Sequence, residues 1–478
     1  MSWLYDLAIA LAALTFAYFA LLNLVYLVFT AVAWRSLTRH LRARGHAADD
    51  EIFASPVTPP VSVLVPAFDE EPTIVDSVHS LLALRYPEHE VIVVNDGSLD
   101  GTLERLQEEF DLVPVRKALR VVIPTAAIRG VYVSRRNRRL WVVDKENGGK
   151  ADALNAGVNA SRFPYILAID ADALLEEDSL LRVVRPIVAS PDLVVATGGI
   201  VRIANGCRID HGRVVDVRLP TSRLAILQVL EYFRAFLIGR VGWSHMNALL
   251  IVSGAFGLFR RSLVEAVGGY SSETVGEDIE LVVRLHRHLR ERDEAYRIEF
   301  VPDPVCWTEA PESMGQLSRQ RRRWHRGLGE TLWRHRRLAG NGRYGVLGLA
   351  AVPYFLIFEF FGPIFEVLGI PVVFGWWLLG DLSGVYLAGF LVIALLVGVV
   401  LSLAALTLEE HSFRRHRDGR DIARLVRFSV LENLGYRQLL SFWRFLAFYD
   451  LLRGHREWGE MSRKGFRTMP EAPLPPPA

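Results

Sequence analysis

The sequence predicts an α/β domain with a mostly parallel sheet, flanked by transmembrane and interfacial α-helices. In the middle of the chain, short apolar runs rich in β-branched residues alternate with helical patterns, which is typical of a parallel sheet. Towards both ends, apolar segments become long enough to cross a bilayer. These segments explain a hydrophobic content of 51% and a mean hydropathy of +0.22, which is high for a protein without membrane segments.

The composition excludes several classes of protein. The net charge of +2 is too small to indicate nucleic acid as a partner, and no basic run interleaved with aromatic residues indicates it either. The two cysteines, Cys207 and Cys306, lie in no Cys-x-x-Cys or Cys/His pattern. A disulfide framework or a structural zinc site is therefore not expected, and we expect two buried thiols in a reducing compartment.

A first transmembrane helix is predicted over residues 1–34, because residues 5–34 are almost continuously apolar. This segment is too long for the apolar core of a signal peptide, and no small-residue cleavage pattern follows it. A basic linker, 35–59, comes next. Because positively charged flanks stay inside, we expect the domain that follows to be cytoplasmic and the protein to be a multi-pass protein of the plasma membrane.

Further transmembrane helices are predicted over residues 344–408. The segment 346–379 is too long for one straight span and contains Pro363, so we expect a kinked helix there. The segment 385–408 is a clean span. The short acidic loop between these two segments is consistent with an outside location.

Residues 409–467 are predicted to form a basic loop and a further membrane-associated helix. That helix, 428–452, is apolar but contains charged residues such as Arg437 and Arg444, so it could be a fourth span or an interfacial or re-entrant helix. The proline-rich tail, 468–478, is expected to be disordered.

The central domain is predicted to cover residues 60–340, with interfacial helices near 222–239 and 313–336. Strands are expected at residues 61–65, 90–94, 140–143 and 165–169. Helices are expected at 72–84, from a cap at Ser98 or Asp100 to about residue 110, and at 150–160. Three of the strands end in polar clusters, at residues 68–71, 95–98 and 170–172. Because ligands bind beyond the carboxyl ends of strands in an open α/β sheet, these clusters indicate a nucleotide site.

Asp170 and Asp172 lie two residues apart where a strand ends, so both carboxylates can point the same way. Unpaired, they would repel each other, and a hard divalent cation is bound through one or two carboxylates together with substrate phosphates. The alternative is an ordinary helix cap or turn. The position of the pair, in line with the other two clusters, favours a metal site.

Lys150 follows Asn147-Gly148-Gly149 at the start of a predicted helix, where the helix N-terminus favours anions. It could meet a ribose, a phosphate or a base, or it could be a solvated lysine in an ordinary turn. The chain has no Gly-x-Gly-x-x-Gly motif, and Ala151 follows the lysine where a P-loop has Ser or Thr. Dinucleotide-dependent oxidoreductases and P-loop ATPases are therefore excluded.

Two further groups could take part in chemistry. Glu277 and Asp278 begin an amphipathic helix, where an acid either caps the helix or serves as a general base. Gln320, Arg323 and Trp324 lie at i, i+3 and i+4 and so share one helical face. That face combines an amide, a guanidinium suited to phosphate and an indole suited to stacking on a sugar ring.

Other charged residues in these helices are expected to be surface groups. Glu231 and Arg234 are predicted to be surface charges. The alternative interpretation of the helix at 313–336 is a basic membrane-surface helix, in which four arginines face lipid headgroups. These four are Arg319, Arg321, Arg322 and Arg326.

Taken in order, these motifs resemble the processive inverting family-two glycosyltransferases, which include cellulose, hyaluronan, chitin and poly-N-acetylglucosamine synthases. The resemblance covers about residues 60–328, and each motif is weak alone while the ordered set is specific. The motifs are Pro66-Ala67-Phe68-Asp69-Glu70-Glu71, Asn95-Asp96-Gly97-Ser98, Gly149-Lys150-Ala151, Asp170-Ala171-Asp172, Glu277-Asp278 and Gln320-Arg321-Arg322-Arg323-Trp324.

The resemblance implies a nucleotide-diphospho-sugar transferase (GT-A-like) fold and a UDP-sugar donor. Asp170 and Asp172 would hold the donor diphosphate through Mg²⁺ or Mn²⁺, and Asp278 would deprotonate the acceptor hydroxyl. Asp96 would contact the uracil. The other donor-binding residues implied are Ala67, Phe68, Glu70, Lys150 and Arg323, and the acceptor-binding residues are Ser253, Gly254, Glu277, Gln320 and Trp324.

The chain departs from the family pattern at several positions. Gly276 stands where a threonine usually precedes the Glu-Asp pair, which could loosen acceptor positioning, and Asn95 replaces a common aspartate. Phe68-Asp69 replaces a frequent Tyr-Asn, so a hydroxyl contact near the nucleotide could be missing. The basic segment 119–139 could be a flap over the donor, although a solvated hairpin is the simpler interpretation.

The resemblance also implies a growing polysaccharide or a glycolipid as acceptor, membrane lipid as surroundings and accessory secretion subunits as further partners. Two alternatives remain open: an enzyme that transfers one sugar to a lipid carrier, and a non-catalytic membrane subunit of a secretion complex. The presence of both metal carboxylates and the candidate base speaks against the second.

Overall fold

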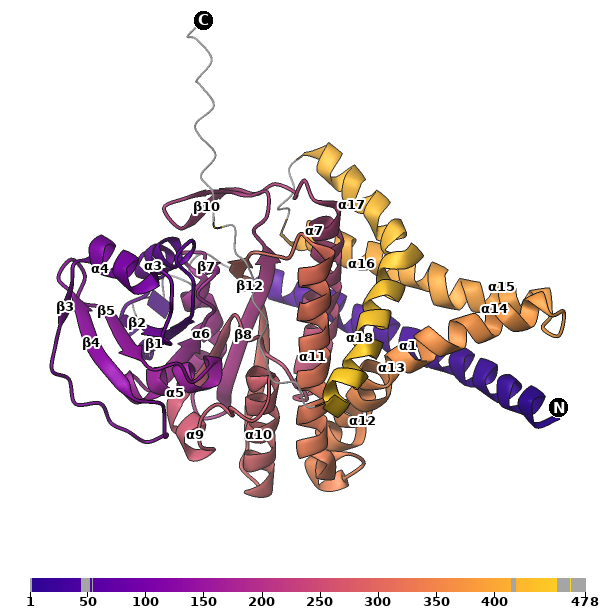
Figure 1. Cartoon of the computed structure of the whole chain (residues 1–478), viewed down its shortest axis with the longest axis horizontal. Helices are drawn as coiled ribbons and strands as arrows, with labels where there is room; N and C mark the ends of the chain where they lie inside the picture. Colours follow the sequence, from indigo (N-terminus) through magenta and orange to yellow (C-terminus); the bar gives the residue numbers. More distant parts are fainter. Residues whose placement is uncertain (1, 44–51, 54, 414–417, 454–464, 466–478) are drawn as a thin grey trace, which may run out of the picture.

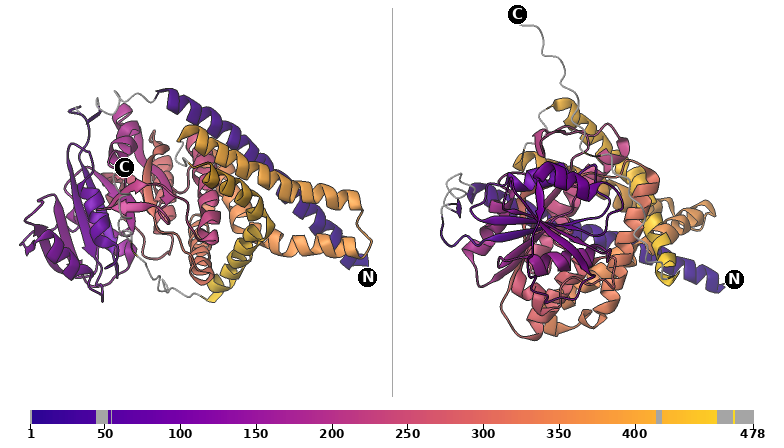
Figure 2. Two further views of the ribbon diagram at one scale, coloured as in Figure 1. Left: turned by 90° about the horizontal axis from the view of Figure 1, so that it is seen from above. Right: turned by 60° about the vertical axis from the view of Figure 1, so that its left-hand side comes forward.

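The computed structural model describes residues 2–43, 52–53, 55–413, 418–453 and 465 (Figure 1). The proline-rich tail predicted at 468–478 lies outside these residues, as does much of the predicted basic linker. An α/β domain occupies one end of the molecule, and apolar helices project from the opposite end, where the N-terminus lies (Figure 1, Figure 2).

The domain is built on a ten-stranded sheet with the order β3-β4-β5-β2-β1-β6-β11-β8-β12-β7. Strands β5, β2, β1 and β6 lie side by side in this order and run parallel to one another. Strand β11 is antiparallel to both β6 and β8. The bounds are β1 Val61–Ala67, β2 His89–Asn95, β3 Leu112–Pro114, β4 Ile128–Ser134, β5 Leu140–Lys145, β6 Tyr165–Ala168, β7 Ala173–Leu175, β8 Val194–Ile203, β11 Gly257–Arg260 and β12 Arg297–Thr308.

The central strands are buried on both faces, which explains their continuous apolar sequences. Helices α3 (Ile74–Leu82), α4 (Thr102–Phe110) and α5 (Lys150–Ala160) connect them, and α6 (Ser179–Ala189) packs on β8 and β12. The predicted α/β class with a mostly parallel core is confirmed, and the antiparallel pairs lie on both sides of the parallel strands β5, β2, β1 and β6.

The domain also includes further helices and a small hairpin. Helix α9 spans Arg261–Ala266, α10 Glu277–Glu291 and α11 Met314–Arg334, and a small hairpin is formed by β9 Arg208–Asp210 and β10 Arg213–Asp216. Residues 119–139 contain β4, which pairs with β3 and β5 at the sheet edge. Cys306 is a buried free thiol, as expected, and Cys207 is half-buried.

Among the residues that the structure describes, three helices are long and apolar enough to cross a membrane: Asp6–His40, Leu347–Leu378 and Gly384–Ser412. Helix α1 (Ser2–Ala43) continues nine residues past Trp34, so the first basic residues extend the helix instead of opening a linker. The second helix bends at Phe361, two residues before Pro363, where the sequence predicts a kink.

The last segment forms two helices, α17 (Gly419–Leu431) and α18 (Arg437–Arg453). The chain between them breaks the helix at Leu434 and at Gly435, whose φ is 112°. Helix α18 packs along α11, and both run roughly across the direction of α1 (Figure 1). Neither α17 nor α18 is among the three helices that could span a membrane by length and composition.

Buried ion pairs join the domain to the apolar helices. Arg202 on β8 forms a two-pronged hydrogen bond with Glu409 on α16 (Val397–Ser412), and both side chains are buried. Arg234 pairs with Glu432 at 2.7 Å, on a helix that continues α7 (Arg223–Phe233). The prediction that Arg234 is a surface charge is therefore wrong, because its charge is neutralised between packed helices.

Several arginines of α11 also lie inside the structure instead of facing lipid. Arg321 is buried and pairs with Glu231 at 3.0 Å, so Glu231 is not the surface charge predicted either. Arg322 donates to Asp450 of α18 at 2.7 Å, and Arg326 donates to Glu330 at 2.7 Å. For Arg321 and Arg326, the interpretation as lipid-facing residues is wrong because both are buried beside an acidic partner. The side chain of Arg322 is 34% exposed, so its contact with lipid headgroups stays a prediction.

Replacing Glu409 with glutamine is expected to destabilise the protein by about 3–5 kcal/mol, because Arg202 is then left as an unpaired buried charge. Thermal unfolding of the purified protein in detergent measures the effect as a lower apparent melting temperature. Glu299→Gln removes the partner of the exposed Arg297 and serves as the control, with little change expected. Equal melting temperatures for wild type and Glu409→Gln would contradict the prediction.

Candidate active site

Three polar clusters meet at one edge of the sheet because β2, β1 and β6 are neighbours and run in the same direction. The backbone N–H of Asp96, which follows β2, donates to the carbonyl of Ala67 at the end of β1, at 2.8 Å. Asp170 follows β6 on the other side of β1. The structure therefore brings together the clusters that the sequence predicts at the strand ends.

The loop after β1 is joined to the loop after β2 by side-chain hydrogen bonds. Asp69, with φ of 53°, accepts from the N–H of Leu99 at 2.7 Å. The N–H of Glu70 donates to the Thr102 hydroxyl at 2.9 Å. Phe68, on the same loop, is 46% exposed. The two loops thus form one rigid ledge on which an aromatic ring remains accessible.

Asp96 is 2% exposed and organises the turn in front of α5. Its carboxylate accepts from the N–H groups of Gly148 at 3.0 Å and Gly149 at 2.7 Å, and from the ammonium group of Lys145. Burial raises the pKa of Asp96, against the effect of Lys145 and of the two N–H groups. Asp96 therefore fixes the turn that leads into Lys150.

Sequence reasoning missed Lys145, which is fully buried at the end of β5. Its ammonium group pairs with Asp96 and, at 2.6 Å, with Asp152 in the first turn of α5. A buried lysine needs such partners, since an isolated buried charge is costly. The local signal was a run of charges, Asp144-Lys145-Glu146, at the end of an apolar strand, which is also typical of a solvated turn.

Lys150 connects two parts of the predicted site. Its Nζ lies 2.6 Å from Oδ1 of Asp170 and 3.1 Å from Oε1 of Glu277. Burial disfavours the charged form, yet Asp170 and Glu277 together raise the pKa of Lys150. A single ammonium group therefore holds the strand-end carboxylate beside the acidic start of α10.

The carboxylates of Asp170 and Asp172 create negative charge that a cation would offset. Burial raises the pKa of the Cys306 thiol, and Asp170 and Asp172 raise it further, so both carboxylates act on the same neighbourhood. Within the described part of the chain, no group of three His, Cys, Asp or Glu side chains forms a closed metal cage. This donor set fits Mg²⁺ or Mn²⁺, which is bound by one or two carboxylates and substrate phosphates.

Asp278 lies beside Glu277 in the first turn of α10. Burial raises the pKa of Asp278, and the like charge of Glu277 raises it further. Gly254 lies directly against this carboxylate, since a Cβ there would be 2.9 Å from Oδ2 of Asp278. The predicted Ser253-Gly254 pair is therefore adjacent to the candidate base, and glycine leaves its carboxylate accessible.

Arg240 is a second residue that sequence reasoning missed. Burial lowers its pKa to about 10, against an opposing effect of the nearby Asp278. Its guanidinium lies 3.7 Å from the ring centre of Phe236 and donates from Nε to the carbonyl of Val252 at 3.0 Å. No local pattern distinguishes this arginine, because its relation to Asp278 arises only from the packing of α7 and its continuation.

Helix α11 meets the start of α10 through two glycines. A Cβ on Gly327 would lie 2.9 Å from Cα of Gly276, so the two backbones touch. Val275, just before Gly276, donates from its N–H to Oε2 of Glu330 at 3.0 Å. The departure from the family's threonine at Gly276 thus has a steric reason: a larger residue would push α11 away.

The same contact places the predicted amide–guanidinium–indole face near Asp278. Gln320, Arg323 and Trp324 precede Gly327 by seven, four and three residues and so lie on its face of α11. Trp324 is 45% exposed, and the guanidinium of Arg321 lies 4.3 Å from the centre of its ring. Oε1 of Gln320 is buried without a hydrogen bond from any residue the structure describes.

The arrangement matches a known family of enzymes. Residues 59–327 match the family model described as "Glycosyltransferase like family 2". This match covers more than half of the chain, so the protein belongs to that family.

Relatives with curated names can now be compared. The poly-β-1,6-N-acetyl-D-glucosamine synthase of Staphylococcus epidermidis is 31% identical over 277 residues, which cover 57% of this chain and 56% of the relative. The synthase of the same name from Staphylococcus aureus (strain COL) gives the same values. The alignment thus spans little more than half of each protein. A mannosyltransferase from Pyrobaculum calidifontis, solved with GDP-Man and Mn²⁺, is 18% identical with a TM-score of 0.48, covering 91% of this chain and 100% of the other.

Replacing Gly327 with alanine is expected to lower stability by about 1–3 kcal/mol, because the new methyl group would overlap the backbone of Gly276. Thermal unfolding in detergent checks this. Gly315→Ala on the same helix is the matched control, since its Cβ would meet nothing nearer than 3.7 Å. If Gly327→Ala melts at or above the temperature of Gly315→Ala, the close approach of the two helices is not rigid.

Proposed function

We propose that this protein is an inverting, processive glycosyltransferase that transfers sugar from a UDP-sugar to the end of a growing polysaccharide. The observation that carries the proposal is the position of Lys150, bonded to Asp170 on one side and to Glu277, next to Asp278, on the other. This contact brings the candidate metal carboxylate within one side chain's reach of the candidate base. The motif order and the family membership support the same reaction.

The nucleotide would lie on the ledge formed by the loops after β1 and β2. Ala67, Phe68 and Glu70 belong to one loop, and Asp96 stands at the start of the other. The exposed ring of Phe68 offers a stacking surface for a base. Because the side chain of Asp96 already binds the turn before α5, its contribution to uracil recognition would include holding this turn in place.

The donor diphosphate would lie at Asp170 and Asp172, with Lys150 and Arg323 as cationic neighbours. A divalent cation, Mg²⁺ or Mn²⁺, would neutralise the charge that develops on the leaving diphosphate. The acceptor sugar would lie at Ser253, Gly254, Glu277, Gln320 and Trp324, with the indole beneath a sugar ring.

In the reaction, Asp278 accepts the proton of the acceptor hydroxyl while the hydroxyl oxygen bonds to the anomeric carbon of the donor. The bond between that carbon and the diphosphate oxygen breaks, and UDP leaves with the electron pair. A single displacement inverts the anomeric configuration. The raised pKa of Asp278 suits it to this role, since a more basic carboxylate takes a proton more readily.

The three apolar helices would cross the plasma membrane, with the catalytic domain in the cytoplasm. Basic residues such as Arg35 and Arg39 lie at the end of α1 nearest the domain, as the positive-inside rule requires. The spanning and interfacial helices would help the growing polymer to leave the cell, and accessory secretion subunits could assist. Transfer of one sugar to a lipid carrier remains the alternative outcome.

Purified protein with Mg²⁺ or Mn²⁺ and a set of UDP-sugars tests the proposal through UDP release and product size. UDP-N-acetylglucosamine is the first donor to try, because both staphylococcal relatives are named for its polymer. Asp278→Asn is expected to lower UDP release by about 10²–10⁴-fold while metal-dependent UDP binding remains. Asp170→Ala is expected to lose both.

Asp192→Asn, at an exposed residue, is the control and should release UDP at the wild-type rate. A high-mass product supports processive synthesis, and a single-sugar lipid product supports the alternative. If no donor gives turnover or metal-dependent UDP binding, the catalytic proposal fails and the protein is a non-catalytic subunit.

Glu277→Gln is expected to move the acid limb of the kcat/KM profile to lower pH. Asp278 accepts a proton only when ionised, so activity falls as pH drops through its raised pKa. Removing the like charge of Glu277 lowers the pKa of Asp278 and extends activity to more acidic conditions. Glu273→Gln, at an exposed side chain paired with Arg334, should leave the limb in place. A limb that moves to higher pH in Glu277→Gln would refute the role of this pair.

A further inference from the structure

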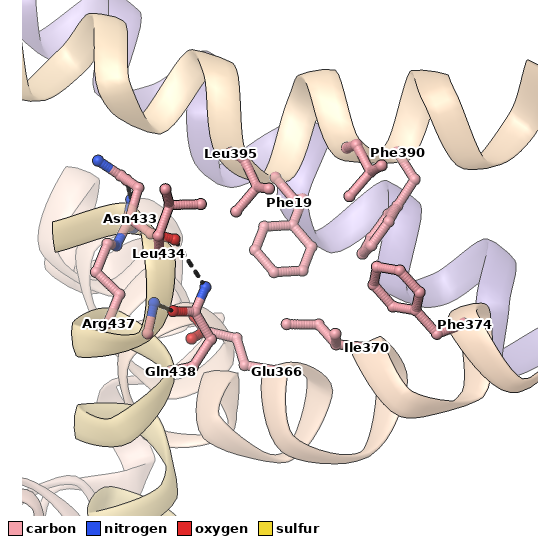
Figure 3. Close-up of a pocket in the computed structure, with 13 residues that line it drawn as sticks. Phe19, Glu366, Ile370, Phe374, Phe390, Leu395, Asn433, Leu434, Arg437 and Gln438 are labelled. Carbon is pink, nitrogen blue, oxygen red and sulfur yellow. Dashed lines mark hydrogen bonds between the residues drawn. The ribbon is translucent and has the colours of Figure 1, made fainter. Parts of the chain in front are cut away.

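A cavity lies among the apolar helices, outside the candidate active site (Figure 3). Its volume is about 180 Å³, and it is partly open to the surroundings. Its largest part is lined by apolar side chains from the three candidate spans, including Phe19, Ile370, Phe374, Phe390 and Leu395. A cavity of this volume is smaller than a typical small-molecule pocket, so it would take only part of a larger ligand.

The other end of the cavity is polar. Glu366 contributes from the second span, Asn433 from the break between α17 and α18, and Arg437 and Gln438 from the start of α18 (Figure 3). The break turns the backbone at Gly435 out of helical geometry, so polar backbone groups and side chains gather there.

Neighbouring residues satisfy most of these polar groups. Gln438 accepts from the N–H of Gly435 at 2.8 Å and donates to the carbonyl of Asn433 at 3.2 Å. Glu366 accepts from the hydroxyl of Tyr18 at 3.0 Å and from that of Ser441. Residues of the same chain therefore occupy the hydrogen-bonding groups of Gln438 and Glu366.

Arg437 differs from them. Nη1 donates to Oδ1 of Asn433 at 2.9 Å, and within the described ranges this guanidinium forms no ion pair with a carboxylate. By contrast, Arg444, further along the same helix α18, pairs with Glu359 at 3.0 Å. Since a charge among apolar helices is costly without a counterion, Arg437 has charge and donors available for an anion from outside the chain.

The polar and apolar parts of the cavity follow each other in the order expected across one leaflet of a bilayer. The polar end lies at α18, which runs across the spans beside the α/β domain, while the apolar walls continue along the spans away from the domain (Figure 1, Figure 3). A phospholipid in the leaflet nearest the domain has the same order, with its headgroup towards the domain and its acyl chains away from it.

We propose that this cavity binds a membrane phospholipid, with its phosphodiester at Arg437 and an acyl chain between Phe19, Phe374 and Phe390. Arginine matches a phosphate in geometry and charge. A polysaccharide segment fits the cavity less well, because the larger part of its wall offers no hydrogen-bonding groups.

The bound lipid would brace α18 against the candidate active site. Helix α18 packs along α11, with Arg322 of α11 bonded to Asp450 of α18. The same α11 carries Gln320, Arg323 and Trp324. A lipid in the cavity, at the N-terminal end of α18, would therefore also help to hold α11, the helix that carries the predicted acceptor-binding residues.

Native mass spectrometry of delipidated protein tests the proposal, with phosphatidylglycerol and a diacylglycerol of the same acyl chains as probes. Wild-type protein is expected to bind one phosphatidylglycerol in preference to diacylglycerol. Arg437→Gln keeps an amide donor for Asn433 but removes the charge, and should weaken phosphatidylglycerol binding at least fivefold and abolish the preference. Ala394→Trp fills the apolar part and should weaken the binding of both probes.

Leu396→Trp, at an exposed position of the same helical segment and outside the cavity wall, is the matched control and should bind as wild type does. Equal phosphatidylglycerol binding by wild type, Arg437→Gln and Ala394→Trp would overturn the proposal. Retention of carbohydrate instead of phospholipid by the purified wild type would overturn it too. Neither donor nor metal is present, so the result is independent of the proposed transferase activity.

Discussion

The ammonium group of Lys150 pairs with two carboxylates that come from distant parts of the chain. Asp170 stands at the end of a parallel strand, and Glu277 opens a helix more than a hundred residues later. Without this cation, the negative charges of Asp170, Asp172, Glu277 and Asp278 would repel one another across the edge of the sheet. The turn that places Lys150 depends in turn on Asp96 and the buried Lys145, so one chain of charges extends from the nucleotide ledge to the candidate base.

Close packing between helices also determines the geometry of the candidate site. The close contact of Gly276 with Gly327 sets how near α11 comes to Asp278, and α18 covers α11 on another side. Ion pairs such as Arg202 with Glu409 then fix the sheet to the apolar helices. Because interiors are close-packed and buried pairs tolerate little misalignment, a displacement of the membrane helices would be transmitted to the active site.

Much of the fold could be predicted because local patterns and tertiary structure agree there. The helix predicted at 150–160 is α5, and the strands predicted before the three polar clusters are β1, β2 and β6. Strand β8 was not predicted, since Gly198 interrupts its apolar run. That glycine is required because a Cβ would overlap Val252 from a crossing segment. Strand β12 contains two prolines, and its pairing with β8 shifts register between Phe300 and Val305.

In the candidate site, too, local patterns predict some residues and miss others. The motif residues at strand ends are brought together as expected, since parallel strands deliver their carboxyl ends to one edge. Lys145 and Arg240 could not be predicted, because each acts on a residue far away in sequence, Asp96 for Lys145 and Asp278 for Arg240. The ion pairs of Arg321 and Glu231 were missed for the same reason: a helical pattern shows which residues share a face, but not which helix covers it.

The boundary of the matched family region has a practical consequence. The match ends at residue 327, within α11, which continues to Arg334. A shortened chain cut at that boundary would lose Glu330, and with it the acceptor for the N–H of Val275 and the partner of Arg326. It would also leave Arg322 without Asp450 and uncover the surface on which α18 rests. The part of the chain needed for folding therefore extends beyond the region that matches the family. A soluble catalytic fragment would need a replacement for α18.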